Sequence, residues 1–192
     1  LLRGQVIIAV ITLLFVGPLA EAQGDRALVS GFLDAVPAHE LVPGAQRYGE
    51  VRDDLPIVEA LGAEGPLGYV FLTSDFVTTT GYSGKPIHVL MGVNGDAVIT
   101  GVRLVEHAEP IVLIGIPDAK IQAVTEKYSG LDLRVEAEAQ GNGHELDIVS
   151  GATVTIMVID DSIVRSGLRV ARALGLGGLQ AEQRHSGPLR RL

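Results

Sequence analysis

The chain has 192 residues, of which 47% are hydrophobic, and this length and composition suit one folded domain with additional end segments. Its formal net charge is −8 and it contains no tryptophan, so a nucleic-acid-binding surface is not expected. It also contains no cysteine, which excludes disulfides, thiolate-ligated zinc or iron–sulfur centres and thiol catalysis within it, so any covalent cofactor would need another nucleophile.

The N-terminal segment has the three parts of a secretory signal peptide. Arg3 precedes an apolar run over residues 6–16, and an Ala20-x-Ala22 pattern follows. The run is shorter than the roughly 20 apolar residues that a membrane-spanning helix needs. We therefore predict that residues 1–22 are a signal peptide cleaved after Ala22, with retention as an N-terminal anchor as the alternative. The mature chain is then expected in the periplasm or at the extracytoplasmic face of the membrane.

The first half of the mature chain is predicted to change from helical to β structure. Apolar spacing predicts a short helix over residues 27–37, and one helical turn is expected at residues 57–61. Residues 69–72 form a candidate strand, and residues 73–81 are predicted to be a polar connection after it.

A β-hairpin is the clearest local prediction. Asn94 and Gly95 lie between two runs rich in β-branched residues, 87–93 and 97–105, and both turn residues tolerate positive φ. Ahead of this hairpin, residues 81–86 form a glycine-rich turn whose backbone N–H groups could lie near a ligand. Taken alone, that pattern favours only a turn.

Two further elements and one pair of polar residues follow the hairpin. A helix is predicted over residues 118–128, because Pro117 and an acidic first turn suit a helix start. Residues 131–137 alternate like a half-buried edge strand. His107 and Glu109 are two residues apart at a strand end and are expected to point the same way, which leaves surface polarity and a binding role equally open.

The most informative stretch is residues 147–155, at the start of a long apolar-periodic segment. Ser150 is predicted to cap a helix N-terminus, and Gly151 and Ala152 keep the turn free of bulk. Thr153 then lies in the first turn, beside N–H groups without intrahelical partners and the positive end of the helix dipole, which together suit a phosphate. Two interpretations stand at this point: an ordinary helix cap, or a phosphate held or esterified at Thr153.

The segment after this stretch is predicted to form a long helix, residues 152–174, ended by the glycines of residues 175–178. Four apolar side chains are predicted to form its buried stripe: Met157, Val164, Leu168 and Ala171.

Five residues in this stretch match a known modification motif. Asp147, Ser150, Gly151, Ala152 and Thr153 fill every place of the pattern acid, two spacers, Ser or Thr, Gly, Ala, Thr. On this motif the chain resembles the FMN-binding domain family. The resemblance implies that a separate flavin transferase joins FMN to Thr153 through a phosphodiester.

The same resemblance implies further cofactor-binding residues. The family has a similar Gly-Tyr-x-Gly turn before its hairpin and a His-x-Glu segment after it. The residues of this chain that match, together with the second threonine of the helix start, are Gly81, Tyr82, Ser83, His107, Glu109 and Thr155.

Residues 68–75, 107–117 and 147–165 are similar to the extracytoplasmic flavin domain of the NosR/NirI family, membrane proteins that serve nitrous oxide reductase. In the related subunits of Na⁺-pumping NADH:quinone reductase and Rnf, the His-x-Glu is usually followed by Thr-Pro-Gly. This chain has Pro110-Ile-Val instead, which favours NosR/NirI. The resemblance covers about residues 51–174 and does not extend to the membrane bundle or the cysteine-rich ferredoxin-like part of that family.

We therefore predict an α+β fold, a mainly antiparallel sheet with flanking helices and the flavinylation motif at the N-terminus of the long C-terminal helix. An FMN-binding domain is expected over residues 51–175, after a helical or extended segment at 23–50 and before a tail or linker at 176–192.

The expected function is an electron-transfer relay or regulator for nitrous oxide reduction, a redox component rather than a stand-alone enzyme. Its expected partners are the flavin transferase, membrane redox components and the nitrous oxide reductase system, without nucleic-acid contact. No metal site is predicted, because the five histidines lack metal-binding spacing. The alternatives are an FMN subunit of the Rnf or NADH:quinone reductase type, and a non-redox module that senses a ligand or docks onto a partner.

Overall fold

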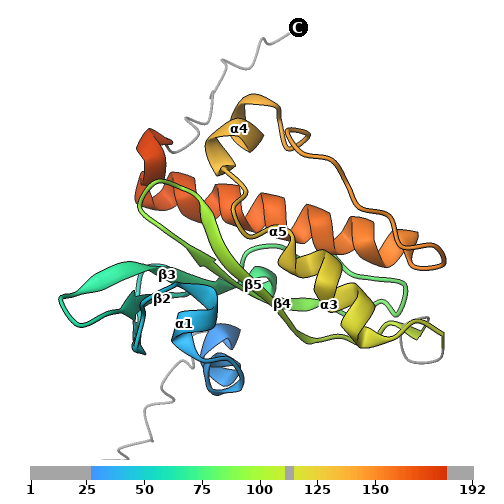
Figure 1. Ribbon diagram of the computed structural model, residues 1–192, viewed down its shortest axis with the longest axis horizontal. Helices are drawn as coiled ribbons and strands as arrows, with labels where there is room; N and C mark the ends of the chain where they lie inside the picture. The colour runs from blue at the N-terminus through green and yellow to red at the C-terminus, as the bar shows by residue number, and fades with distance from the viewer. Residues whose placement is uncertain (1–26, 111–114, 181–192) are drawn as a thin grey trace, which may run out of the picture.

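The computed structural model describes residues 27–110 and 115–180, which form a five-stranded antiparallel sheet flanked by helices (Figure 1). Each strand pairs with its neighbour in sequence, so the sheet order is β1-β2-β3-β4-β5. The strands are β1 Arg47–Val51, β2 Ile57–Leu61, β3 Pro66–Leu72, β4 His88–Val93 and β5 Ile99–Glu106. The helices are α1 Ala38–Leu41, α3 Asp118–Glu126, α4 Leu133–Glu138 and α5 Thr153–Leu174. The predicted α+β class, the hairpin and the long C-terminal helix are confirmed.

Both faces of the sheet are buried. Alternate residues of a strand point to opposite sides, so neighbouring residues belong to different apolar clusters. In β4, Val89 and Met91 belong to a large apolar cluster that also contains buried side chains of α3, α4 and α5. Leu90, between them, belongs to a second cluster with Leu41 of α1. The domain thus has three layers, with α5 over one face of the sheet and α1 over the other (Figure 1).

The short helix α1 packs very close to the sheet, over two glycines. Gly92 of β4 and Gly101 of β5 lie opposite each other in the ladder, and a Cβ at either would overlap the backbone of Glu40 or Leu41. Thr100 Oγ1 donates a hydrogen bond to the Leu41 carbonyl at 2.6 Å. Because only glycine leaves this space, the two residues fix where α1 can lie.

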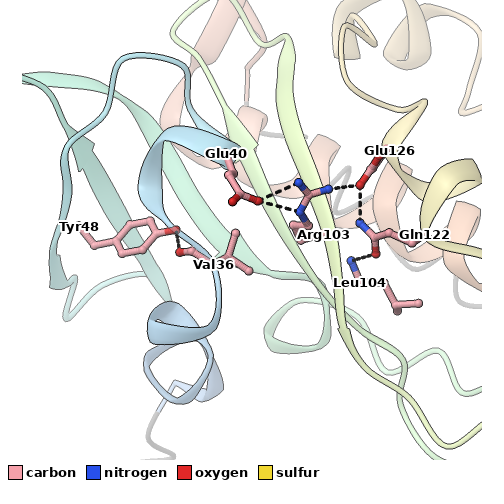
Figure 2. A network of polar contacts seen from close by, with 7 residues as sticks. All are labelled: Val36, Glu40, Tyr48, Arg103, Leu104, Gln122 and Glu126. Carbon is pink, nitrogen blue, oxygen red and sulfur yellow. Dashed lines mark hydrogen bonds and ion pairs between the residues drawn. The ribbon is translucent and has the colours of Figure 1, made fainter. Parts of the chain in front are cut away.

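Arg103 of β5 ties both neighbouring helices to the edge of the sheet. Figure 2 shows its guanidinium between Glu40 of α1 and Glu126 of α3. Gln122 of α3 accepts a hydrogen bond from the backbone N–H of Leu104 at 3.1 Å, so that an N–H of the edge strand is satisfied. Partly exposed ion pairs contribute only about 0–1 kcal/mol each, so this network orients the helices more than it stabilises them.

Helix α5 runs for 22 residues and ends where the glycines predict. Gly175 has a left-handed conformation, with φ of 68°, and its N–H donates to the carbonyl of Ala171. The predicted stripe is confirmed for Val164, Leu168 and Ala171, which are buried. It is wrong for Met157, whose surface is 53% exposed near the start of the helix. Beyond α5, Leu176 is buried and the N–H of Gly177 donates to Gly95 O at 2.9 Å.

Three local predictions are wrong. Residues 57–61 form β2, because they pair with both β1 and β3, and such pairing overrides a weak helical pattern. Residues 131–137 form no strand beyond one bridge at Asp132, whose side chain accepts from the Arg134 N–H and starts α4 instead. Residues 27–37 contain two short 3₁₀ turns in place of an α-helix, and Pro37 precedes α1.

No helix within residues 27–110 and 115–180 is long and apolar enough to cross a membrane. The predicted signal peptide or anchor and most of the predicted tail lie outside the described residues.

Candidate functional site

Thr153 is the first residue of α5, and the helix begins there without a side-chain cap. The N-cap residue is Ala152, whose carbonyl accepts from the Ile156 N–H at 2.9 Å. The prediction that Ser150 caps the helix is wrong, because Ser150 lies two residues before the N-cap and is exposed. Gly151, with φ of 89°, turns the chain into the helix. The first-turn N–H groups therefore have no side-chain cap, and together with the helix dipole they suit an external anion.

A cavity of about 470 Å³ opens beside Thr153. It is lined by Tyr82, Pro110 and residues 151–155. The Tyr82 side chain is the most exposed large apolar group in the described part of the chain, at 77%, and Val154 is 47% exposed. A volume of this size, with mostly apolar walls and a few polar groups, is typical of sites for drug-sized ligands and cofactors.

Behind this cavity the carboxylate of Glu109 is completely buried and joins two other segments. Its Oε2 accepts from the Tyr82 N–H at 3.0 Å and from Thr155 Oγ1 at 2.9 Å, and its Oε1 accepts from the Ser83 N–H at 3.2 Å. A Cβ at Gly81 would overlap this carboxylate. Five residues predicted separately from the sequence thus meet at one point.

The hydrogen bonds keep Glu109 ionised in spite of its burial. Burial alone raises the pKa of this carboxyl group, but the donated bonds from Ser83, Thr155 and Tyr82 outweigh it, so the pKa lies below its ordinary value. Glu109 therefore acts as an acceptor for neutral donors and stays negatively charged near neutral pH.

His107 lies in different surroundings. Its Nε2 is 3.3 Å from Oδ1 of Asp118, at the start of α3, and its Nδ1 accepts from the Glu109 N–H at 3.3 Å. It lines a separate cavity of about 520 Å³ together with Gln122. Strand β5 ends at Glu106, so the alternation that would aim residues 107 and 109 the same way no longer applies. Among the described residues, His107 is not part of the lining beside Thr153.

Asp147 is exposed in the loop that leads to α5. Its Oδ2 is 2.8 Å from Nζ of Lys127, at the end of α3. Asp147 also lies at the edge of a small cavity that includes Tyr128 and His144. The acidic residue of the motif is therefore accessible from solvent, and its one ion pair is with a side chain that is itself largely exposed.

A second, partly buried network anchors the loop between α4 and α5, and no sequence signal pointed to it. His144 lies between two carboxylates, with Nδ1 3.1 Å from Glu136 Oε1 and Nε2 2.8 Å from Asp160 Oδ1. Tyr128 Oη donates to the same Asp160 at 2.7 Å, and burial together with this bond raises the pKa of Tyr128. These four residues come from α4, the loop, α5 and the end of α3, so only the fold brings them together. Within the described residues no group of acids and histidines is arranged to hold a metal.

A family model for the FMN-binding domain matches residues 81–166, from the glycine-rich turn to the middle of α5. The regulatory protein NosR of Pseudomonas aeruginosa is 36% identical over 148 residues, which are 75% of this chain and 21% of that relative. The protein NirI of Paracoccus denitrificans is 44% identical over 113 residues, which are 58% of this chain and 16% of that relative.

A subunit of the ion-translocating oxidoreductase complex of Aliivibrio fischeri is 29% identical over 145 residues, which are 67% of this chain and 68% of that subunit. The chain spans about a fifth or less of the length of the NosR and NirI relatives. Residues 81–166 thus match the FMN-binding domain family, which indicates FMN as the cofactor of this domain, and the chain is similar to NosR and NirI over 148 and 113 residues.

Proposed function

We propose that this domain carries FMN esterified through its phosphate to the hydroxyl of Thr153, and that it relays electrons for, or regulates, a nitrous oxide reduction system of the NosR kind. One observation carries the proposal. Thr153 is exposed at the uncapped start of α5, and it lines a mostly apolar cavity that is large enough for a cofactor. The residues present fit the two parts of FMN, because helix N–H groups suit the phosphate and apolar walls suit a flat ring.

In this proposal the first turn of α5 holds the phosphate, and Tyr82, Pro110 and Val154 provide apolar surface for the ring. FMN supplies the one- and two-electron chemistry when bound, while the protein supplies its binding, orientation and electrostatic surroundings. Asp147 and Gly151 are proposed as the features of the exposed loop that the flavin transferase engages. The electron partners are proposed to be membrane redox components and the nitrous oxide reductase system.

A covalent bond has a clear advantage at the proposed extracytoplasmic location. A cofactor that dissociates there is diluted and lost, whereas an esterified cofactor stays with the protein whatever the strength of its noncovalent contacts.

The test is the intact mass of protein exported from a host that contains the flavin transferase. We expect the mass of the chain plus esterified FMN, and loss of that addition in Thr153→Val, which keeps the side-chain shape and removes the hydroxyl. Thr155→Val is the matched control, because its hydroxyl is turned to Glu109 and is buried. Acid-precipitated Thr153→Val that still holds flavin would overturn the assignment, and loss of flavin from Thr155→Val alone would move it to the second threonine.

A second candidate function is a flavin subunit of an ion-translocating oxidoreductase, because the chain covers two thirds of the related subunit from Aliivibrio fischeri. The two are distinguished with a fusion protein in which this domain replaces the similar segment of NosR, tested for restored growth on nitrous oxide with Thr153 and with Thr153→Val. The alternative without redox chemistry is a module that docks onto a partner. Wild-type protein without visible flavin absorption would favour this alternative.

A further inference from the structure

The carboxylate of Glu109 holds together three segments that are far apart in sequence. Two of its hydrogen bonds come from the backbone of the turn at Tyr82 and Ser83, and the third comes from Thr155 in the first turn of α5. The latter contact spans 46 residues of sequence. Since the side chain is 0% exposed and both oxygens already accept hydrogen bonds, Glu109 has no free face toward the cavity.

The position of the Tyr82 side chain depends on these hydrogen bonds more than the position of a buried side chain would. Its side chain is 77% exposed, so its own packing does little to hold it in place. Its position beside the cavity is set by its backbone. Hydrogen bonds from Gly81 N–H to Lys85 O and from Gly84 N–H to Gly81 O close the turn, and the bond from the Tyr82 N–H to Glu109 connects this turn to the start of α5. The neighbouring residue Gly81 has no side chain, which allows the turn to approach the carboxylate this closely.

We propose that Glu109 is a positioning residue of the flavin site, which acts through Tyr82. Its buried carboxylate holds the Tyr82 turn against the start of α5, and thereby keeps an aromatic wall beside Thr153 on which the flavin ring packs. The inference rests on the proposed function, and it assigns to Glu109 a role other than direct contact with the cofactor. Aromatic side chains favour stacked or edge-to-face contacts with other rings, which makes a fixed tyrosine a suitable wall.

The fluorescence lifetime of the attached flavin measures this contact directly. A tyrosine in van der Waals contact with an excited flavin ring shortens its lifetime by electron transfer to the ring. The chain has no tryptophan and four tyrosines, so few side chains can produce the effect. Tyr82 is the tyrosine among the residues that line the cavity. Of the other three, Tyr48 donates to Val36 O, Tyr128 donates to Asp160, and Tyr69 lies within β3.

The experiment compares flavinylated wild type, Tyr82→Leu, Glu109→Gln and the double variant. Tyr82→Leu is expected to lose the short lifetime component. Glu109→Gln is expected to lose much of it, because an amide has one acceptor oxygen and turns an NH₂ group toward a donor. In the double variant, Glu109→Gln should add nothing to the effect of Tyr82→Leu, which is the non-additivity expected of a residue that acts through another.

Asp75→Asn is the matched control. Asp75 is also a carboxylate whose two oxygens accept from two backbone N–H groups, those of Leu28 and Val29, but it lines a different cavity and is not part of the loop that leads to Thr153. Asp75→Asn should destabilise the domain while leaving the lifetime as in wild type. An equal lengthening in Asp75→Asn and Glu109→Gln would show a merely structural effect and overturn the proposal.

If Glu109→Gln fails to fold or to take up FMN, Thr155→Val replaces it, because it removes one of the three bonds and should lengthen the lifetime less. A wild-type lifetime in that variant would then overturn the proposal. An unchanged lifetime in Glu109→Gln with full FMN mass overturns the positioning role and leaves the attachment at Thr153 standing. Wild-type protein without the FMN mass overturns the proposed function itself.

Discussion

The two ends of α5 are built in opposite ways. At the C-terminal end Gly175 closes the helix in a left-handed conformation, Leu176 is buried, and Gly177 donates to the β4–β5 turn at Gly95. At the N-terminal end the helix starts without a side-chain cap, and Val154 and Met157 are exposed. The protein itself covers the polar and apolar groups at the C-terminal end, whereas the N-terminal end has no side-chain cap and exposes two apolar side chains, as the proposed flavin site requires.

The largest expected effect separates the buried middle of α5 from its exposed start. Ile163→Ala removes a side chain that is 0% exposed, and should lower the free energy of unfolding by about 2–5 kcal/mol. Met157→Ala, at a position that is 53% exposed, should change it by less than about 0.5 kcal/mol. Chemical denaturation of both variants measures this, and a large loss for Met157→Ala would contradict the exposed position of that side chain.

A matched pair of glycines tests the two ends with the same perturbation. Gly151 and Gly175 have φ of 89° and 68°, and alanine in a left-handed conformation costs about 1–2 kcal/mol. Both variants should lose similar stability. Only Gly151→Ala should also lower the fraction of chains with FMN in the intact-mass spectrum, since it lies in the loop beside Thr153. Equal flavinylation of the two variants would count against a role for the loop in modification.

A smaller effect is expected from the pH dependence of Glu109. Its pKa in the fold lies below the ordinary value, so its charge stabilises the fold above the unfolded-state pKa, and this contribution is lost as the pH falls through the folded-state pKa. The stability difference between wild type and Glu109→Gln should therefore be larger at pH 7 than near or below about pH 4. Asp54→Asn, at an exposed pair with Arg52, should show a weaker dependence. A difference that grows in acid would contradict the ionised state of Glu109.

The smallest effect is expected at His107. It contacts Asp118 in a cavity apart from the one beside Thr153, so His107→Ala should leave the midpoint potential of attached FMN near the wild-type value between about pH 6 and pH 8. Redox titration of both proteins checks this. A pH-dependent shift in wild type that disappears in the variant would place His107 in electrostatic contact with the flavin.

Local signals in the sequence were sufficient for part of this arrangement. Asn94-Gly95 between two β-branched runs predicted the hairpin, and the apolar period followed by Gly175 predicted the extent of α5. The flavinylation motif located Thr153 at the helix start, although the cap was assigned to the wrong residue. Each of these signals lies within a few residues of the feature that it predicts.

The remaining features depend on contacts between distant segments. Residues 57–61 are a strand because two other strands pair with them, and His144 meets Asp160 only after α5 has packed on the sheet. The bond between Glu109 and Thr155 likewise has no local signature, and the end of β5 before His107 separates two residues that the spacing suggested would act together.

The meander order of the sheet has a consequence for the timing of assembly. All strand pairs join neighbours in sequence, and such local contacts form early because little chain entropy is lost in closing them. The bonds that dock α5, such as Thr79 to Asp161 and Arg169 to Phe76 O, close loops of 82 and 93 residues. We therefore expect the sheet to form first and the surroundings of Thr153 to be completed last. If FMN is attached as proposed, a modifying enzyme that requires the finished loop would act only on chains that have already folded, and attached flavin would then mark a completed fold.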